Sequence, residues 1–458
     1  MPPLPQRLGE PYLGQRYLAA ALLAAGHEVR GVDMAARRWR GDVADVAAAI
    51  EDFKPDIVGM TLFTHNAWAG YGLLSDLPLG PWLTVAGGPH VTARPAEALR
   101  HGFDVAVTGE GERIIVALAD AFCANKRKDN LPALPGIWRA DGVQRPAEAL
   151  TDLDGMALPL TADGCWQAYW YNVQGGVTSS GAITSRGCPA RCTFCANHVT
   201  GRIFRWRSNA DVLAELRALR QTADMRHFAF WDDAFTANKE RVRKFCDQIR
   251  RDDVLAGTTW SCITPANMVR PELLADMAAA GCVAINFGIE SGDPVVLKAI
   301  GKGQRPQQVT AAVHAASDHD IRTVVNFMFG FPEEGLEGLE RTASFMAELA
   351  PVVDFFNPRG VLVPLPATPI YERWHQQHGF TDWWLRPEMA AMEPDPVDLT
   401  TEQAAALAEL DPALEHNFFG YPAEVKERIA ELVRAKARHN QRTLARMTAA
   451  VAPKATGG

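Results

Sequence analysis

The pattern of hydrophobic and polar positions divides the first 125 residues into alternating helices and strands. Apolar residues at helical spacing predict helices over 13–25 and 43–53. Short apolar runs bounded by polar residues, proline or glycine predict three strands, at 56–63, 82–86 and 104–108, and the stretch 27–33 after Gly26 reads as a further short strand. Strands that alternate with helices are typical of a doubly wound, Rossmann-like parallel sheet.

The predicted strands of this first region end in glycines and small polar residues. These ends are Thr61–Asn66, Gly87–His90 and Gly109–Glu112. Ligands of doubly wound sheets bind at the carboxyl ends of the strands. We therefore expect a ligand site along this edge.

A second series of strand–helix units follows from residue 181. The expected strands lie at 182–184, 227–231, 259–263, 283–288, 322–329 and 355–363, with helices such as 271–281, 307–319 and 335–350 between them. Six such units predict a partial (β/α)6 TIM-like barrel, whose chemistry belongs at the rim where the strands end.

The remaining residues form a linker and a helical C-terminal region. The linker, 126–180, contains an Asp-Gly turn signal for a hairpin near 135–142 and four aromatic residues within 165–171. The C-terminal region is expected to have helices over 401–412 and 422–448. The predicted organisation is thus a sheet domain (1–125), a linker (126–180), a barrel (181–375) and a helical region (376–458).

Composition excludes several classes of protein. The 458 residues carry a formal net charge of −8 without a long basic run, which argues against broad nucleic-acid binding. No apolar stretch reaches the roughly 18–20 residues of a membrane span, and the N-terminus does not resemble a secretory signal. Eight cysteines in a chain of this length do not suggest a disulfide framework, so we expect a cytoplasmic protein.

Three cysteines form a tight cluster after the first barrel strand: Cys188, Cys192 and Cys195. Soft thiolates at this spacing select iron–sulfur clusters, zinc or copper(I). A structural zinc site needs four ligands, and only His198 follows closely enough to be the fourth. The alternative is a 4Fe–4S cluster held by three cysteines, in which one iron stays open for a ligand.

This motif, with an aromatic residue before its last cysteine, resembles that of the radical S-adenosylmethionine (SAM) superfamily. The resemblance covers the barrel through four motifs: Trp-Asp-Asp-Ala-Phe-Thr (231–236), Phe-Gly-Ile-Glu-Ser-Gly-Asp (287–293), Asn-Phe-Met-Phe-Gly-Phe-Pro-Glu-Glu (326–334) and Pro-Leu-Pro-Ala-Thr-Pro (364–369). It implies that the open iron binds SAM, and that SAM contacts come from Phe194, Asp232, Glu290, Ser291 and Phe329. For Asp232 an ordinary pair with Asp233 at the rim is an alternative. Arg202, Arg205 and Arg207 pair with a carboxylate of SAM or substrate, or are simply solvated.

The first region resembles the cobalamin-binding domain that precedes many radical SAM enzymes. The matching pieces are Gly-Met-Thr-Leu-Phe-Thr (59–64), Ala-Gly-Gly-Pro-His-Val-Thr (86–92) and Asp-Val-Ala-Val-Thr-Gly-Glu-Gly-Glu (104–112). The family's usual first strand is missing ahead of the Pro-Pro at 2–3, and there is no Asp-x-His-x-x-Gly motif to supply a histidine to cobalt. Each of His65 and His90 is a candidate cobalt ligand or a hydrogen-bonded loop histidine. The resemblance implies cobalamin contacts from Thr61, Leu62, Thr64, His65, Gly87, Gly88, Gly109 and Glu110.

Together the two resemblances imply a cobalamin-dependent radical SAM methyltransferase of secondary metabolism. Such an enzyme methylates an unactivated carbon, or phosphorus, of a small-molecule or peptide precursor, and it receives electrons from a donor such as flavodoxin or ferredoxin. One alternative keeps the cofactors but catalyses a rearrangement, ring contraction or oxidative cyclisation. A cobalamin-like domain that binds no cobalamin, and a corrinoid- or SAM-binding sensor without turnover, are further alternatives.

Overall fold

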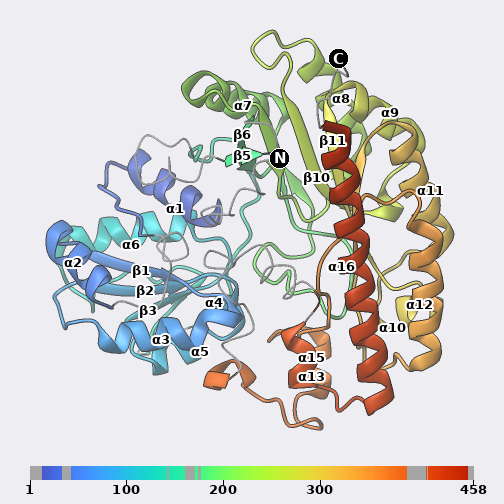
Figure 1. Cartoon of the computed structure of the whole chain (residues 1–458). Coiled ribbons are helices and arrows are strands. Elements are labelled where there is room, and N and C mark those ends of the chain that lie inside the picture. Colours follow the sequence, from blue (N-terminus) through green and yellow to red (C-terminus); the bar gives the residue numbers. More distant parts are fainter. Residues whose placement is uncertain are drawn as a thin grey trace, which may run out of the picture.

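The computed structural model has two α/β bodies side by side, with the C-terminal helices packed against the second (Figure 1). It describes residues 13–32, 43–140, 142, 144–159, 171–173, 177–388, 409 and 411–451. None of the helices it describes is both long and apolar enough to cross a bilayer.

The first body is a four-stranded sheet with helices on both faces. Strands β1 (Ile57–Thr61), β2 (Leu83–Gly87) and β3 (Val105–Val107) run parallel in the order β1-β2-β3, and β4 (Ile137–Trp138) adds antiparallel to β3. Helices α1 (Leu13–Ala24) and α6 (Glu112–Asn125) cover one face, and α3 (Ala67–Asp76), α4 (Pro89–Ala93) and α5 (Pro95–Arg100) cover the other (Figure 1). Helix α2 (Val43–Phe53) packs on α3 through Val46, Ile50, Leu73 and Leu77.

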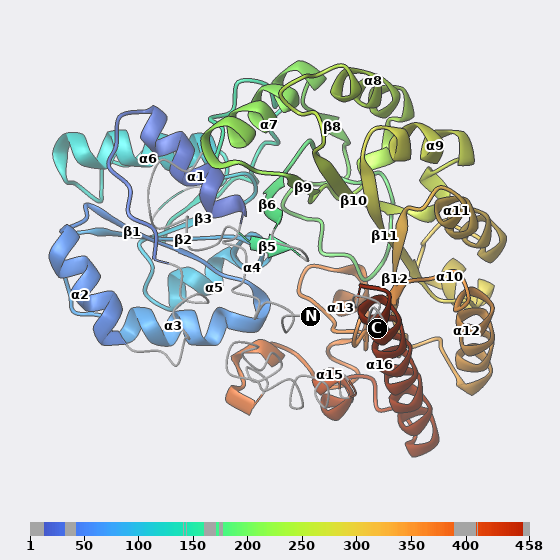
Figure 2. The ribbon, with the colours of Figure 1, turned by 45° about the horizontal axis from the view of Figure 1, so that its top comes forward.

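The second body is an open barrel. Six parallel strands follow in the order β6 (Val177–Ala182), β9 (His227–Phe230), β10 (Thr259–Pro265), β11 (Cys282–Glu290), β12 (Arg322–Phe327) and β13 (Phe355–Phe356). Strand β5 (Tyr171–Val173) adds antiparallel to β6, and β7 (Ser185–Arg186) pairs with β8 (Arg205–Trp206) around the cysteine loop. The helices form an outer ring (Figure 2): α7 (Asn209–Ala223), α8 (Lys239–Arg250), α9 (Pro271–Ala279), α10 (Pro294–Ala299), α11 (Pro306–Asp318) and α12 (Leu336–Leu349).

The C-terminal region lies at the open side of the barrel. Helix α13 (Pro369–Trp374) and the short α15 (Pro412–His416) lead to α16 (Ala423–Val451), which runs beside β13 and α12 (Figures 1 and 2). Its buried face is Val425, Ile429, Leu432 and Val433, the spacing of three and four that the sequence predicted. These residues join a hydrophobic core that continues from the barrel into the first body.

The structure confirms the α/β fold class: a doubly wound parallel sheet followed by a partial barrel of six strand–helix units and a helical C-terminus. One predicted strand is wrong, because residues 27–32 are irregular. A strand needs a hydrogen-bonded neighbour, and this stretch is held instead through side chains, His27 to Asp120 and Arg30 to Asp52. The hairpin predicted near 135–142 is supported by two backbone bonds, from Gly142 to Arg139 at 3.3 Å across the turn and from Gly136 to Arg145 at 3.0 Å. Its first strand, β4, also pairs with β3. The aromatic stretch 165–170 and most of the helix expected at 401–412 lie outside the described residues.

Candidate active site

The cysteine loop follows β6 and is fastened at several points. Gly187 begins it with φ +84, and a side chain there would collide with the carbonyl oxygen of Ile203. The backbone of Thr193, in the middle of the loop, donates to Ile300 at 2.9 Å and accepts from Ile370 at 3.0 Å. The loop is therefore held against two other rim segments of the barrel.

The donor set of this loop fits an iron–sulfur cluster. Cys188 and Cys192 are buried and Cys195 is exposed. Burial raises the pKa of the Cys188 and Cys192 thiols, and partial loss of hydration together with the nearby Cys192 raises that of Cys195 to about 11 even though its side chain reaches solvent. A bound metal would therefore be needed to hold the three as thiolates. No group of three or more His, Cys, Asp or Glu side chains in the described part of the chain is arranged to hold a single ion. An iron–sulfur cluster does not need its cysteines as close together as a single ion does, because the iron and sulfide atoms of the cluster lie between the cysteine sulfurs.

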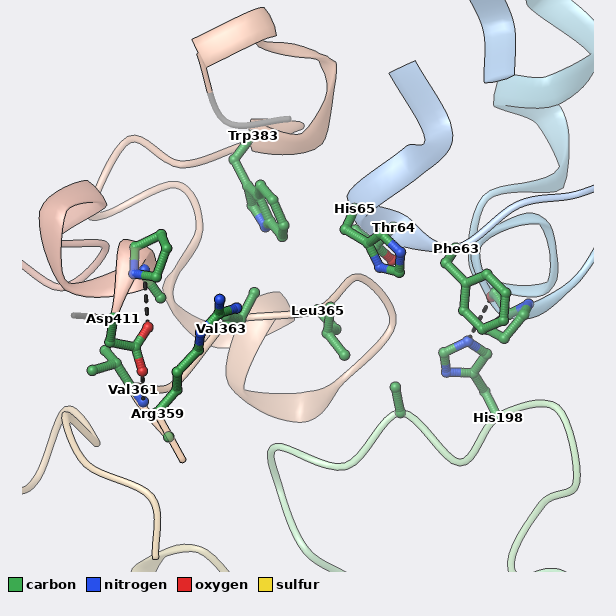
Figure 3. A pocket seen from close by; sticks show the side chains of 15 residues that line it. Phe63, Thr64, His65, His198, Arg359, Val361, Val363, Leu365, Trp383 and Asp411 are labelled. Carbon is green, nitrogen blue, oxygen red and sulfur yellow. Dashed lines mark hydrogen bonds between the residues drawn. The ribbon is translucent and has the colours of Figure 1, made fainter. Parts of the chain in front are cut away.

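His198, the possible fourth ligand, turns toward the first body. Its Nε2 donates to the carbonyl oxygen of Pro89 at 2.8 Å (Figure 3), and burial lowers the pKa of its imidazole. Its Nδ1 is buried and has no hydrogen-bond partner among the described residues. The four-ligand zinc site that the sequence left open thus finds no support in this arrangement.

A buried ion pair lies beside the cysteine loop. Lys302 donates to Glu290 at 2.7 Å, and its ammonium is 6.0 Å from the centre of the Phe194 ring. Burial opposes the charge of Lys302, but Glu290 and the nearby Cys192 raise the pKa of its ammonium above the usual range. Glu290 ends β11 with φ +73, an uncommon backbone conformation that is often found at functional sites. A carboxylate held there fits an amino group such as that of SAM.

Other residues predicted to contact SAM are engaged within the protein. Asp232 is buried and accepts hydrogen bonds from the backbone and hydroxyl of Thr184 and from the hydroxyl of Ser185. Ser291 is fully buried and bonded to Thr342. Phe329 is also fully buried, and its ring lies under the Lys436 ammonium. Their contacts to SAM remain predictions. The hydrogen-bond partners of Asp232 are Thr184 and Ser185 and not Asp233, so its alternative as a rim pair with Asp233 also remains a prediction.

The cobalamin-type loops of the first body lie together. Gly88 has φ +100, and a Cβ on it would lie 2.8 Å from the carbonyl oxygen of Leu62. Leu62 accepts from the backbone of His90 at 3.0 Å, which ties the two loops. His90 is fully buried, with Nε2 donating to Glu97 at 2.9 Å and Nδ1 3.3 Å from the hydroxyl of Thr64. His90 is therefore a hydrogen-bonded loop histidine. The glycine at position 88 thus lets two of the strand-end segments predicted to contact the corrinoid pack closely against each other.

Glu110, another predicted cobalamin contact, joins the two bodies. Its carboxylate is 2.8 Å from Arg186 and 2.6 Å from Arg205, which flank the cysteine loop, and it also accepts from the backbone of Leu150. All three charged side chains are buried. Arg207 is equally committed, to Asp211 and Glu215 on α7. Arg205 and Arg207 thus serve packing within the protein, an outcome that the sequence did not anticipate.

A cavity of about 300 Å³ lies between the two cofactor loops (Figure 3). Thr64 and His65 line it from the first body, where the His65 ring stacks on Phe63. Ala196 and His198 line it from the cysteine loop. Its remaining wall follows β13 and the C-terminal region: Arg359, Gly360, Val361, Val363, Leu365, Trp383, Asp411, Pro412 and Ala413. Of the lining residues the sequence singled out Thr64, His65 and His198 as candidate ligand contacts, and Phe63, Pro89 and Leu365 lie within the quoted motifs. Arg359 and Asp411 belong to no motif.

Fold and site define a class of two-cofactor radical enzymes, in which a sheet domain for a flat ligand faces a barrel with a three-cysteine loop. The family model of the radical SAM superfamily matches residues 182–346, and that of the B12 binding domain matches residues 10–119. An uncharacterized methyltransferase of Pyrococcus horikoshii is 31% identical over 382 residues, which are 79% of this chain and 78% of that protein. The chain belongs to the cobalamin-dependent radical SAM enzymes of the methyltransferase type.

Two further comparisons describe the group. An anaerobic magnesium-protoporphyrin IX monomethyl ester cyclase of Cereibacter sphaeroides is 27% identical over 72% of this chain and 55% of its own length. The solved structure of the radical SAM methyltransferase TsrM from Kitasatospora setae, with cobalamin and a 4Fe–4S cluster, has the same fold, with a TM-score of 0.66 at 20% identity over 81% of this chain and 77% of that one. The family's cofactors are a 4Fe–4S cluster, SAM and cobalamin, and its members require a substrate and an electron donor.

Proposed function

We propose that this enzyme transfers a methyl group to an unactivated carbon, or to phosphorus, of a small-molecule or peptide natural-product precursor. The observation that carries the proposal is a cavity at which the end of the cysteine loop, the Thr64–His65 loop and the segment after β13 meet. Holding reactants at one place converts a difficult encounter into an intramolecular step. A methyl donor, a radical source and a substrate need such a common space.

The residues around the cavity have distinct tasks in this proposal. Cys188, Cys192 and Cys195 hold the cluster, and the strand-end loops of the first body hold the corrinoid. Together with SAM these groups supply hydrogen abstraction and the methyl group. Glu290, oriented by Lys302, accepts from the SAM ammonium. The apolar wall, which includes Leu365 and Trp383, keeps water away from reactive species.

The partners of the proposed reaction follow from the chemistry. A one-electron donor such as flavodoxin or ferredoxin reduces the cluster, and a reducing compartment such as the cytoplasm suits its thiolates. The methyltransferase relative from Pyrococcus horikoshii supports methyl transfer without naming a substrate.

The experiment is anaerobic purification and reconstitution with iron, sulfide and hydroxocobalamin, followed by a visible spectrum. The proposal expects a corrinoid band beside the iron–sulfur absorbance, and formation of both 5′-deoxyadenosine and S-adenosylhomocysteine when SAM, reductant and substrate are present. Methyl-deuterated SAM then labels the product. Protein that binds the cluster but retains no corrinoid after reconstitution would overturn the proposal.

A second candidate keeps the cofactors but changes the outcome to rearrangement or oxidative cyclisation. The cyclase relative of Cereibacter sphaeroides favours it. Product mass separates the two, because only methyl transfer adds a labelled methyl group. A sensor without turnover would form neither nucleoside product, and the complete set of three cysteines argues against it.

A further inference from the structure

Arg359 extends into the cavity without a partner for its charge. It follows β13, and Figure 3 shows its side chain rising between Val363 and Asp411. Among the described residues no acidic side chain forms an ion pair with its guanidinium, and nothing accepts a hydrogen bond from it. Asp411, the acidic residue of the same wall, accepts from the backbone of Val361 at 2.7 Å and of Ala413 at 3.1 Å. A cationic side chain in a cavity normally has an anion beside it. Since the protein supplies no such partner among the described residues, a bound ligand is the natural source of the negative charge.

The backbone of Arg359 is held in the left-handed region, which is uncommon for a residue other than glycine. Its φ is +61, a left-handed value that residues with a side chain rarely adopt. Gly360 follows with φ +116, and a side chain there would collide with the carbonyl oxygen of Phe327. Lys436 of α16 fixes this turn by donating to the carbonyl oxygens of Phe327 and Arg359. Strain that the surroundings enforce is typical of ligand-binding positions.

His198, which lines the cavity, carries a hydrogen-bond acceptor without a partner among the described residues. The bond from His198 Nε2 to Pro89 requires a proton on Nε2, because a carbonyl oxygen only accepts. Burial lowers the pKa of His198 and favours the neutral ring, so Nδ1 carries a lone pair. This Nδ1 is buried and unpartnered within the part of the chain that the structure describes. A buried polar atom without a partner is rare and favours a ligand that supplies one.

The rest of the wall is mostly apolar. Phe63, Val363 and Leu365 contribute carbon surface. Trp383 donates its N–H to the carbonyl oxygen of Pro364, so it too presents an apolar ring. A volume of about 300 Å³ is at the lower end of the range for small-molecule sites.

We propose that this cavity binds the substrate as a small organic oxyanion, with its acid group on Arg359, an N–H or O–H donor on His198 Nδ1, and an apolar body against Trp383. The inference rests on the proposed function, since it names the substrate class of that site. Arg359 is then a specificity-determining residue. Its planar guanidinium matches a carboxylate or phosphonate through two parallel hydrogen bonds.

The test is calorimetric titration of the reconstituted holoenzyme with four probes. Para-hydroxyphenylpropionate has the acid, the donor and the apolar body. Its amide lacks the charge, phenylpropionate lacks the donor, and phenylethylphosphonate replaces the carboxylate. We expect the hydroxy acid to bind at least about tenfold more tightly than its amide, which corresponds to about 1.4 kcal/mol, and more tightly than phenylpropionate. Comparing phenylethylphosphonate with phenylpropionate shows whether the site prefers a phosphonate or a carboxylate.

Three variants complete the test. Arg359→Met should bring the acid to within about twofold of the amide, Arg359→Lys should retain part of the preference, and the exposed Arg373→Met on α13 should retain all of it. Titration needs no turnover, so its result stands even if methyl transfer is not observed. Equal binding of acid and amide by the unmodified enzyme would overturn the inference without any variant. It would equally be overturned if neither probe bound, or if Arg359→Met lost cobalamin while its probe binding was unchanged.

Discussion

Trp384 donates its indole N–H to both carboxylate oxygens of Glu97, at 3.1 and 3.2 Å, across 287 positions of the sequence. Glu97 belongs to the first body and Trp384 to the segment after the barrel. Burial raises the pKa of Glu97, but hydrogen bonds from His90, Tyr71 and Trp384 outweigh it and hold that pKa below its usual range. The neighbouring Trp383 lines the cavity, so this contact also sets the position of a cavity wall.

Trp384→Phe keeps the ring and removes the donor. Hydrogen bonds to charged groups contribute about 1.5–3 kcal/mol, so we expect the free energy of unfolding to fall by about 2 kcal/mol. Urea denaturation followed by circular dichroism measures it. Trp68→Phe is the control, because Trp68 is 44% exposed. Equal stability of the two variants would show that the contact contributes nothing.

Glu110→Gln weakens both ion pairs that join the bodies around the cysteine loop. Losing one partner of a buried pair is strongly destabilising, by about 3–5 kcal/mol, because the other charge stays buried. The same denaturation experiment should show this loss, whereas Asp129→Asn, in an exposed pair with Arg127, should leave stability unchanged. If Glu110 served cobalamin alone, cobalamin content would fall at unchanged stability.

Cys192→Ala removes a proposed cluster ligand. Iron content and the iron–sulfur absorbance of the reconstituted protein should fall close to zero, together with 5′-deoxyadenosine formation. Cys246→Ala is the control: Cys246 is equally buried but lies on α8, in the hydrophobic core. A cluster that survived in Cys192→Ala would contradict the assignment.

Lys302→Met removes a buried positive charge near Cys192 and Cys195. Cluster potentials depend on the net charge around them, and a lost cation makes reduction harder. We expect the midpoint potential in a spectroelectrochemical titration to become more negative by on the order of tens of millivolts. Lys298→Met, at an exposed position on α10, should leave it unchanged. A shift of equal size in both variants would argue for a general effect of charge.

Lys436 should make stability depend on pH. Burial lowers the pKa of its ammonium from 10.5 to about 7 in the folded protein. Between these two values the unfolded chain keeps a proton that the folded protein releases, so this group makes stability rise with pH, by up to about 1.4 kcal/mol per pH unit. Lys436→Met should flatten the profile between about pH 7 and pH 10. The comparison of the two proteins in urea at several pH values checks it; parallel profiles would contradict the lowered pKa of Lys436 in the folded protein.

The sequence by itself determined the elements and the cysteine loop. Helical spacing in α16 and apolar runs in the barrel strands are local patterns, and each formed as predicted. The spacing of Cys188, Cys192 and Cys195 is likewise local, because a short loop alone can bring three thiols together. Local patterns also identified the glycine-rich ends of the first sheet.

Only the tertiary structure decided which side chains meet. Residues 27–32 read as a strand in the sequence, but they pair with no neighbouring strand among the described residues. Arg205, Arg207 and Arg359 carry the same charge. Arg205 and Arg207 form ion pairs with Glu110 and Glu215, whereas Arg359 lines a cavity. Trp384 meets Glu97 from the far end of the chain. Such pairings depend on which side chains are buried and on which segments, often far apart in the sequence, come together in the fold. The spacing of neighbouring residues encodes neither.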